Sequence, residues 1–338
     1  MDGVEAWWQG GASVVQTWAV ACFVFTVPLV FVDLTVGGVD AWGDLDVSLD
    51  EELEHEALHH WCEAVHETRF VRTPANAYSA LSFCYLGLLV LVIALTYNAT
   101  CAENHLRYFV AFDWFVGLAM LFAGLCSFLN HASVNGGWTR TLDRVSIWPL
   151  VSIPTFLCTL RFFEVPATQC VYVSILSVLL GLLILASVPH LIENGVATSD
   201  VVKHYLNYGV PAIAFLFPVL LVVRRILESQ CVYHHSSLTF GLPTLSVVLS
   251  ILGMVLQDPE LLNVCDPNGP WFLNTHLWWH VLQSISVFLV WFSCYFEDRI
   301  DKAYQAVLAA SRAKRKPRLR LFPSLSELWN LQPARSRV

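Results

Sequence analysis

The sequence predicts an all-α integral membrane protein: a bundle of seven transmembrane helices with one extra N-terminal hydrophobic helix. Its composition, the length of its apolar blocks and the placement of its positive charges support this prediction. Of the 338 residues, 56% are hydrophobic and only 14% are charged, whereas a soluble domain carries roughly 25% charged residues. The apolar residues form eight blocks that can each cross a bilayer, which takes ~20 residues. These blocks cover about residues 14–33, 76–97, 108–130, 142–161, 168–189, 204–223, 237–256 and 271–296.

The blocks predict helices because only helices and closed barrels satisfy their backbone hydrogen bonds in lipid. Barrel strands alternate apolar and polar residues, and these blocks do not. Within the first block, the stretch from Val14 to Val32 contains no charge, and no Lys or Arg precedes it. It therefore matches a signal peptide poorly, and we expect a retained helix, with cleavage as the alternative.

Positive charge predicts the orientation of the chain. Ten of the nineteen Lys and Arg residues follow Asp298, so the positive-inside rule places this tail in the cytosol. Residues 37–67 contain ten acids and no Lys or Arg, and they fall on the opposite side. We therefore predict an extra helix over residues 1–36, an acidic luminal segment over 37–73, a seven-helix catalytic bundle over 74–297 and a basic cytosolic tail over 298–338. The expected partner is a membrane lipid rather than a nucleic acid.

Five polar residues are predicted to meet in one layer near the outer face of the membrane. Ser127 and His131 are four residues apart at the outer end of one span, and His276 and His280 are four apart at the outer start of another. Each pair therefore shares a helix face. Asp143 lies at the outer start of a third span. Ionisable groups inside membrane spans are costly and usually mark function, although interfacial histidines at helix ends are the alternative.

These residue types favour zinc-dependent hydrolysis. Three imidazoles, from His131, His276 and His280, could hold zinc and leave a fourth position open, which is the catalytic arrangement. Zinc lowers the pKa of bound water to about 7, which gives a nucleophile at neutral pH. Asp143 could act as general base and then acid, and Ser127 could donate a hydrogen bond to the developing oxyanion. The expected substrate is a lipid amide or ester, whose acyl chain would lie in the apolar interior.

Two of the ten cysteines differ from the rest. Most lie in apolar blocks, where a buried and inert thiol is the default. Cys62 and Cys265 lie in loops that face outside in this topology. A luminal or extracellular compartment permits a disulfide bond, so we predict one between Cys62 and Cys265.

Several motifs of this chain, in this order, resemble those of alkaline ceramidases. That family belongs to a superfamily that also contains adiponectin receptors and enzymes of lipid-anchor remodelling. The resemblance spans residues 61 to about 296, which corresponds to seven helices. The matching motifs are Trp61-Cys62-Glu63, Thr73-Pro-Ala-Asn76-Ala-Tyr-Ser79, Ser127-x-x-x-His131, Leu142-Asp143, Asp258 to Cys265-Asp-Pro267 and His276-x-x-Trp-His280.

The resemblance implies hydrolysis of the ceramide amide bond to a sphingoid base and a free fatty acid. It implies zinc on His131, His276 and His280, with Ser127 and Asp143 in the roles given above. It also implies the disulfide bond between Cys62 and Cys265, a luminal active site in the endoplasmic reticulum or Golgi, and a cytosolic tail.

The resemblance makes a calcium ion doubtful. Some family members carry a calcium site around the Trp-Cys-Glu segment, and here Trp61, Glu63 and Asn76 match it. Other expected oxygen ligands are replaced, for example by Thr73. Calcium takes six to eight oxygen ligands, so we expect at most a degenerate site.

Three other functions compete with a ceramidase. A zinc hydrolase could act on a different lipid, such as an acyl ester in lipid-anchor remodelling. A receptor-like protein could use the zinc mainly for structure. The sequence His55-Glu56-Ala-Leu-His59 also spells H-E-x-x-H, a zinc protease signature, but the loop is short and acidic, so we interpret this as a chance match.

Overall fold

The computed structural model describes most of the predicted spans and part of the segment between the first two. The described residues are 2–42, 62–66, 68–98, 110–134, 138–162, 237–257, 266 and 269–312, together with 169, 172–173, 175–176, 178–183, 219 and 223. The blocks predicted at 168–189 and 204–223 and the loop that carries His55 and His59 therefore lie largely or wholly outside the described residues.

Within these ranges the protein is helical and forms no strand beyond one isolated bridge between Gly37 and Arg69. The helices are α1 (Asp2–Thr35), α2 (Gly38–Trp42), α4 (Pro74–Asn98), α5 (Val110–Ser133), α6 (Trp138–Phe162), α10 (Ser237–Gln257) and α12 (Thr275–Arg312), with a 3₁₀ turn at Trp271–Leu273. Among the described residues, three helical stretches are long and apolar enough to cross a membrane: Ala12–Thr35, Pro74–Leu95 and Asp113–Ser133. The all-α membrane class is thus confirmed, while the number of seven core helices stays a prediction.

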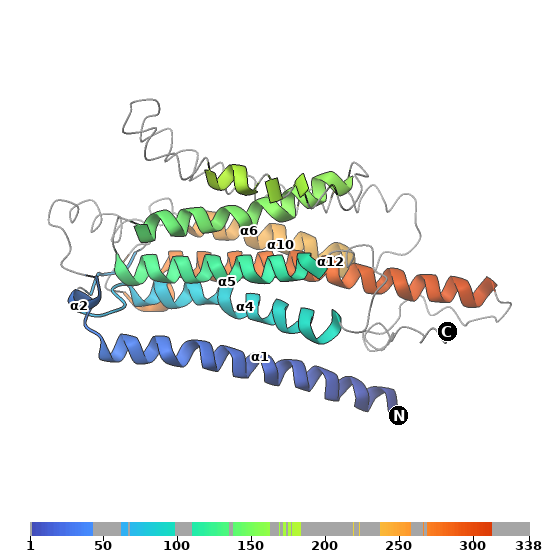
Figure 1. Ribbon diagram of the computed structural model, residues 1–338, viewed down its shortest axis with the longest axis horizontal. Helices are drawn as coiled ribbons and strands as arrows, with labels where there is room; N and C mark the ends of the chain where they lie inside the picture. Colours follow the sequence, from blue (N-terminus) through green and yellow to red (C-terminus); the bar gives the residue numbers. More distant parts are fainter. Residues whose placement is uncertain are drawn as a thin grey trace.

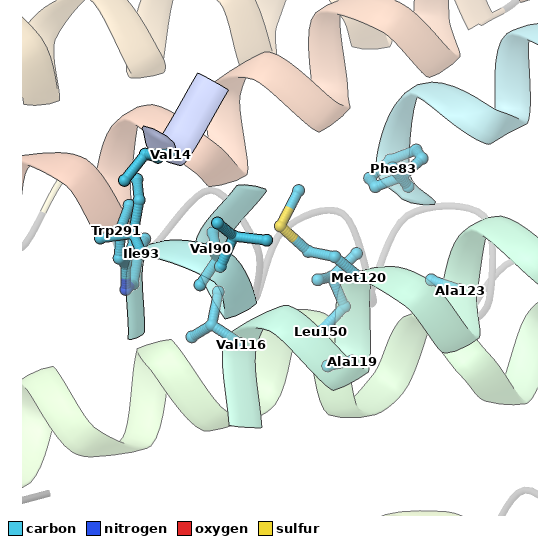
Figure 2. Close-up of a cluster of buried hydrophobic side chains, with 11 residues drawn as sticks. Val14, Phe83, Val90, Ile93, Val116, Ala119, Met120, Ala123, Leu150 and Trp291 are labelled. Atoms are coloured by element: carbon cyan, nitrogen blue, oxygen red, sulfur yellow. The ribbon is translucent and has the colours of Figure 1, made fainter. Parts of the chain in front are cut away.

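Helix α4 is the centre of the described bundle. It packs against α5, α12 and α1, while α6 covers α5 and α10 covers α12 (Figure 1). Buried apolar side chains from these helices form the core, as Figure 2 shows for Phe83 and Val90 of α4, Met120 of α5, Leu150 of α6 and Trp291 of α12. Lipid tails are as apolar as these side chains, so close van der Waals packing between the helices, rather than exclusion of water, stabilises this core.

Helices α4 and α5 approach closely because glycines face each other. A Cβ atom on Gly87 would lie 2.8 Å from the carbonyl oxygen of Gly117, and one on Gly124 would lie 2.5 Å from the Cys84 sulfur. Small residues at such crossings let two backbones pack tightly without lipid between them. This close contact fixes α5, which carries two of the predicted site residues, against α4.

One end of the bundle brings together the end of α5 and the starts of α4, α6 and α12 (Figure 1). The end of α1 and the short helix α2 lie at the same end. All five residues of the predicted layer belong to these helix ends. The connecting segments there, rather than the middle of the bundle, therefore determine the geometry of the candidate site.

Candidate metal centre

Three buried histidines meet at this end of the bundle. His131 comes from the last turn of α5, and His276 and His280 come from the first two turns of α12. Their candidate ligand atoms all lie within 4.8 Å of one another. The ring centroids are 5.2 Å apart for His131 and His276, 5.1 Å for His131 and His280, and 4.7 Å for His276 and His280.

The three rings fit the requirements of a metal ion. They meet edge to face, at interplanar angles of 68°, 73° and 82°, so their nitrogens can point to a common centre. In a tetrahedral zinc site with bonds of about 2.0–2.1 Å, ligand nitrogens are separated by about 3.3 Å. Modest rotation of the side chains would bring this set to that spacing. Three histidines can therefore hold a divalent metal, and they leave a fourth position free for water.

His280 is oriented by a serine that the sequence did not assign to the site. The Ser79 hydroxyl donates to the carbonyl oxygen of Asn76 at 2.8 Å, which uses its one proton. Its oxygen also lies 2.9 Å from Nδ1 of His280, so it accepts the Nδ1 proton. This assigns the Nδ1–H tautomer and leaves the Nε2 lone pair available. Metal-ligating histidines usually donate their other ring N–H in this way, which fixes the ring.

Ser127 and Asp143 lie beside the triad and contact each other. The Ser127 hydroxyl is 3.3 Å from Nε2 of His280 and also hydrogen-bonds to the Asp143 carboxylate. Asn130, which no sequence motif singled out, donates from Nδ2 to Oδ2 of Asp143 at 3.0 Å. The structure thus brings together all five predicted residues, with the carboxylate of Asp143 held by two donors from α5.

The backbone of His131 is held by residues that precede α4. The last carbonyl groups of a helix have no partner within that helix. Here the carbonyl oxygen of His131 accepts from the Thr73 hydroxyl at 2.7 Å and from the Thr73 N–H at 3.2 Å. The next two carbonyl groups, of Ala132 and Ser133, accept from the backbone and the side chain of Arg72. These contacts fix the last turn of α5.

Glu63, a predicted member of the degenerate calcium site, caps α4. One carboxylate oxygen accepts from the N–H of Ala75 at 2.7 Å and the other from the N–H of Asn76 at 2.9 Å. Burial raises the pKa of Glu63 to about 7, although these two N–H groups and the Arg69 charge lower it. Capping explains the position of Glu63 without an ion. Trp61 lies outside the described residues, and calcium binding stays a doubtful prediction.

Cys62 is disulfide-bonded. Its predicted partner, Cys265, lies outside the described residues, so this pairing stays a prediction. Asp266, which follows Cys265 in the chain, and Cys62 both line one cavity of about 720 Å³. The cavity lies between the starts of α4 and α12 and reaches Ser79, whereas none of the three histidines lines it.

No family of known proteins, no curated protein and no solved structure matches this chain. The class that the fold and the site define is therefore a helical membrane protein with a buried histidine group that can bind a metal ion.

Proposed function

We propose that this protein is a zinc-dependent lipid amidase that hydrolyses the amide bond of ceramide to a sphingoid base and a free fatty acid. One observation carries the proposal: three buried histidines converge with a serine and a carboxylate at the end of an apolar helical bundle. The sequence motifs that resemble alkaline ceramidases narrow the substrate from lipids in general to ceramide.

Zinc is the metal that this donor set favours. Three imidazoles with an open fourth position are typical of catalytic zinc, whereas calcium and magnesium prefer oxygen ligands. Zinc bound there would supply a water ligand acidified to a pKa of about 7. The protein's own part is to hold the three neutral imidazoles in place, which Ser79 does for His280 and Thr73 does for His131.

Asp143 would transfer the proton during the reaction. Its carboxylate, held by Asn130 and Ser127, would take a proton from the attacking water and return it to the nitrogen of the leaving amine. Water and amide are thereby converted to carboxylic acid and amine with no other co-reactant. Once Asp143 has taken the proton from water, the Ser127 hydroxyl would turn from it and donate a hydrogen bond to the carbonyl oxygen, on which negative charge has developed.

The disulfide bond supports a luminal site. Disulfide bonds persist in oxidising compartments such as the lumen of the endoplasmic reticulum, and Cys62 lies one residue before Glu63, which caps α4 at the end that carries the site. The positive tail favours the same orientation. We therefore place the active site toward the lumen of the endoplasmic reticulum or Golgi.

The test is to purify the protein in detergent, measure its zinc content and measure the release of sphingoid base from ceramides. The His276→Ala/His280→Ala double variant should lose both zinc and turnover. Ser127→Ala should keep zinc and lose turnover by about 100-fold, as expected for one oxyanion donor. Full turnover in Ser127→Ala would contradict its assigned role, and turnover of a glycerolipid ester but not of ceramide would assign a different substrate.

A further inference from the structure

The extra N-terminal helix α1 contacts the bundle through a small number of specific contacts. It packs on α4, and its outward apolar side chains are exposed, as lipid contact requires; Phe23 is 68% exposed. Midway along α1, the indole N–H of Trp18 donates to the carbonyl oxygen of Tyr85 at 2.7 Å, and the Thr26 hydroxyl lies 3.0 Å from the Tyr85 hydroxyl. These contacts hold α1 in one register along α4.

At the site end of α1, one buried aspartate accepts three hydrogen bonds. The Asp33 side chain is 3% exposed. Its Oδ1 accepts from the N–H of Val71 at 2.9 Å, and its Oδ2 accepts from the Arg69 guanidinium at 3.0 Å and the Tyr78 hydroxyl at 2.8 Å. A buried carboxylate is tolerated only when it is paired and hydrogen-bonded. Asp33 thus connects α1 to residues 69–71 and to the first turns of α4.

Residues 71–73 continue directly to the metal centre. Val71 is fully buried, and its neighbours Arg72 and Thr73 bond to the carbonyl groups of the last turn of α5, including that of His131. The path from Asp33 to the backbone of His131 therefore consists of hydrogen bonds and three consecutive residues. No side chain on this path has a role in the proposed chemistry.

We propose that α1 is a permanent part of the mature protein and that Asp33 is a positioning residue, which holds His131 in place for metal binding through residues 71–73. This inference rests on the proposed zinc site. It concerns the residues that hold the metal-binding His131 in place and does not depend on which reaction the metal catalyses. Loss of the Asp33 charge removes the partner of Arg69 and one acceptor for Tyr78. Residues 69–73 then lose an anchor, and the last turn of α5 becomes less constrained.

Two variants test this path, with one control. Asp33→Asn removes the charge with little change in shape, and Thr73→Val removes the hydroxyl that bonds to His131. Thr35→Ala is the matched control, because Thr35 lies two residues from Asp33 in α1, is exposed, and donates its hydroxyl to the Phe31 carbonyl oxygen of its own helix. The readouts are the rate of zinc release to a chelator and the visible spectrum of the cobalt-substituted protein, which reports ligand geometry.

Both test variants should release zinc roughly tenfold faster and should shift the cobalt spectrum. Roughly tenfold is the lower end of the loss in metal affinity that follows when a residue supporting a metal ligand is mutated. Thr35→Ala should match the wild type. Unchanged release and spectra in folded Asp33→Asn would overturn the role of Asp33. If Asp33→Asn does not fold, unchanged values in Thr73→Val would still overturn the path, because they would remove its last step to His131. A mature protein whose mass lacks α1 would also overturn the proposal. Wild-type protein without zinc would instead overturn the proposed metal, and this inference with it.

Discussion

Glu63 gives the protein a pH-dependent stability that a single isosteric substitution should remove. Its pKa is raised from 4.5 to about 7, mainly by burial. The folded protein therefore keeps this proton at pH values where the unfolded chain has lost it. Stability from this group is fully present below about pH 4.5 and is lost as the pH rises through 7.

The size of the effect follows from the shift. One pKa unit corresponds to 1.36 kcal/mol, so a shift from 4.5 to about 7 corresponds to about 3 kcal/mol. Glu63→Gln keeps the shape and carries no charge at any pH. Its stability relative to the wild type should therefore rise by about 3 kcal/mol between pH 5 and pH 8. Any difference between Gln and Glu in how well they cap α4 does not depend on pH, so its effect on stability cancels when pH 5 is compared with pH 8.

The assay is thermal unfolding of both proteins in detergent at several pH values. For a chain of this length, about 3 kcal/mol corresponds to a change of roughly 5 °C in the difference between the two midpoints. Titration of the histidines is common to both proteins and cancels as well. Parallel curves for the two proteins between pH 5 and pH 8 would refute the reasoning, because burial of Glu63 would then not disfavour its charged form.

Three further predictions follow from the site and the core. Ser79→Ala should lower zinc affinity about tenfold, measured by competition with a chelator, since His280 loses the Ser79 hydroxyl as an acceptor of its ring proton; unchanged affinity would contradict that role. Gly87→Val should destabilise the fold by about 1–3 kcal/mol through overpacking against α5. Gly241→Ala should not, because the new Cβ meets no atom of another described segment within 4 Å. Equal unfolding midpoints for the two variants would argue against the close crossing of α4 and α5. Alkylation without reductant should leave Cys62 unlabelled in a mass spectrum, and labelling would exclude its disulfide bond.

The helices could be predicted from the sequence because length and apolarity alone determine whether a segment spans a bilayer. The stretches Ala12–Thr35, Pro74–Leu95 and Asp113–Ser133 match three predicted blocks closely. The layer of His131, Asp143 and His276 could also be predicted, since spans that alternate in direction place helix ends at known depths. Neither inference needed the contacts between helices.

The side chains that support this layer could not be predicted in the same way. Ser79 and Asn130 are ordinary polar residues within spans, and their roles depend on which helix faces which. The sequence gives even less indication of the role of Asp33, because an acid near the end of a span usually contacts the membrane surface. Its three partners lie 36 to 45 residues away in the chain, and one of them is a backbone N–H, which no side chain specifies.

Both metal-ligating segments lie at helix ends, where backbone groups lack partners and the chain frays unless it is capped. At the start of α12, the Asn274 side chain accepts from the N–H of Leu277 at 3.0 Å, a local cap that the sequence can reveal. At the end of α5, the cap of His131 comes from Thr73, 58 residues earlier. A histidine in a frayed turn would bind metal weakly, because binding would have to order that turn. The capping residues therefore strengthen the proposed zinc site that the imidazoles form, and Asp33 extends this support to the extra helix α1.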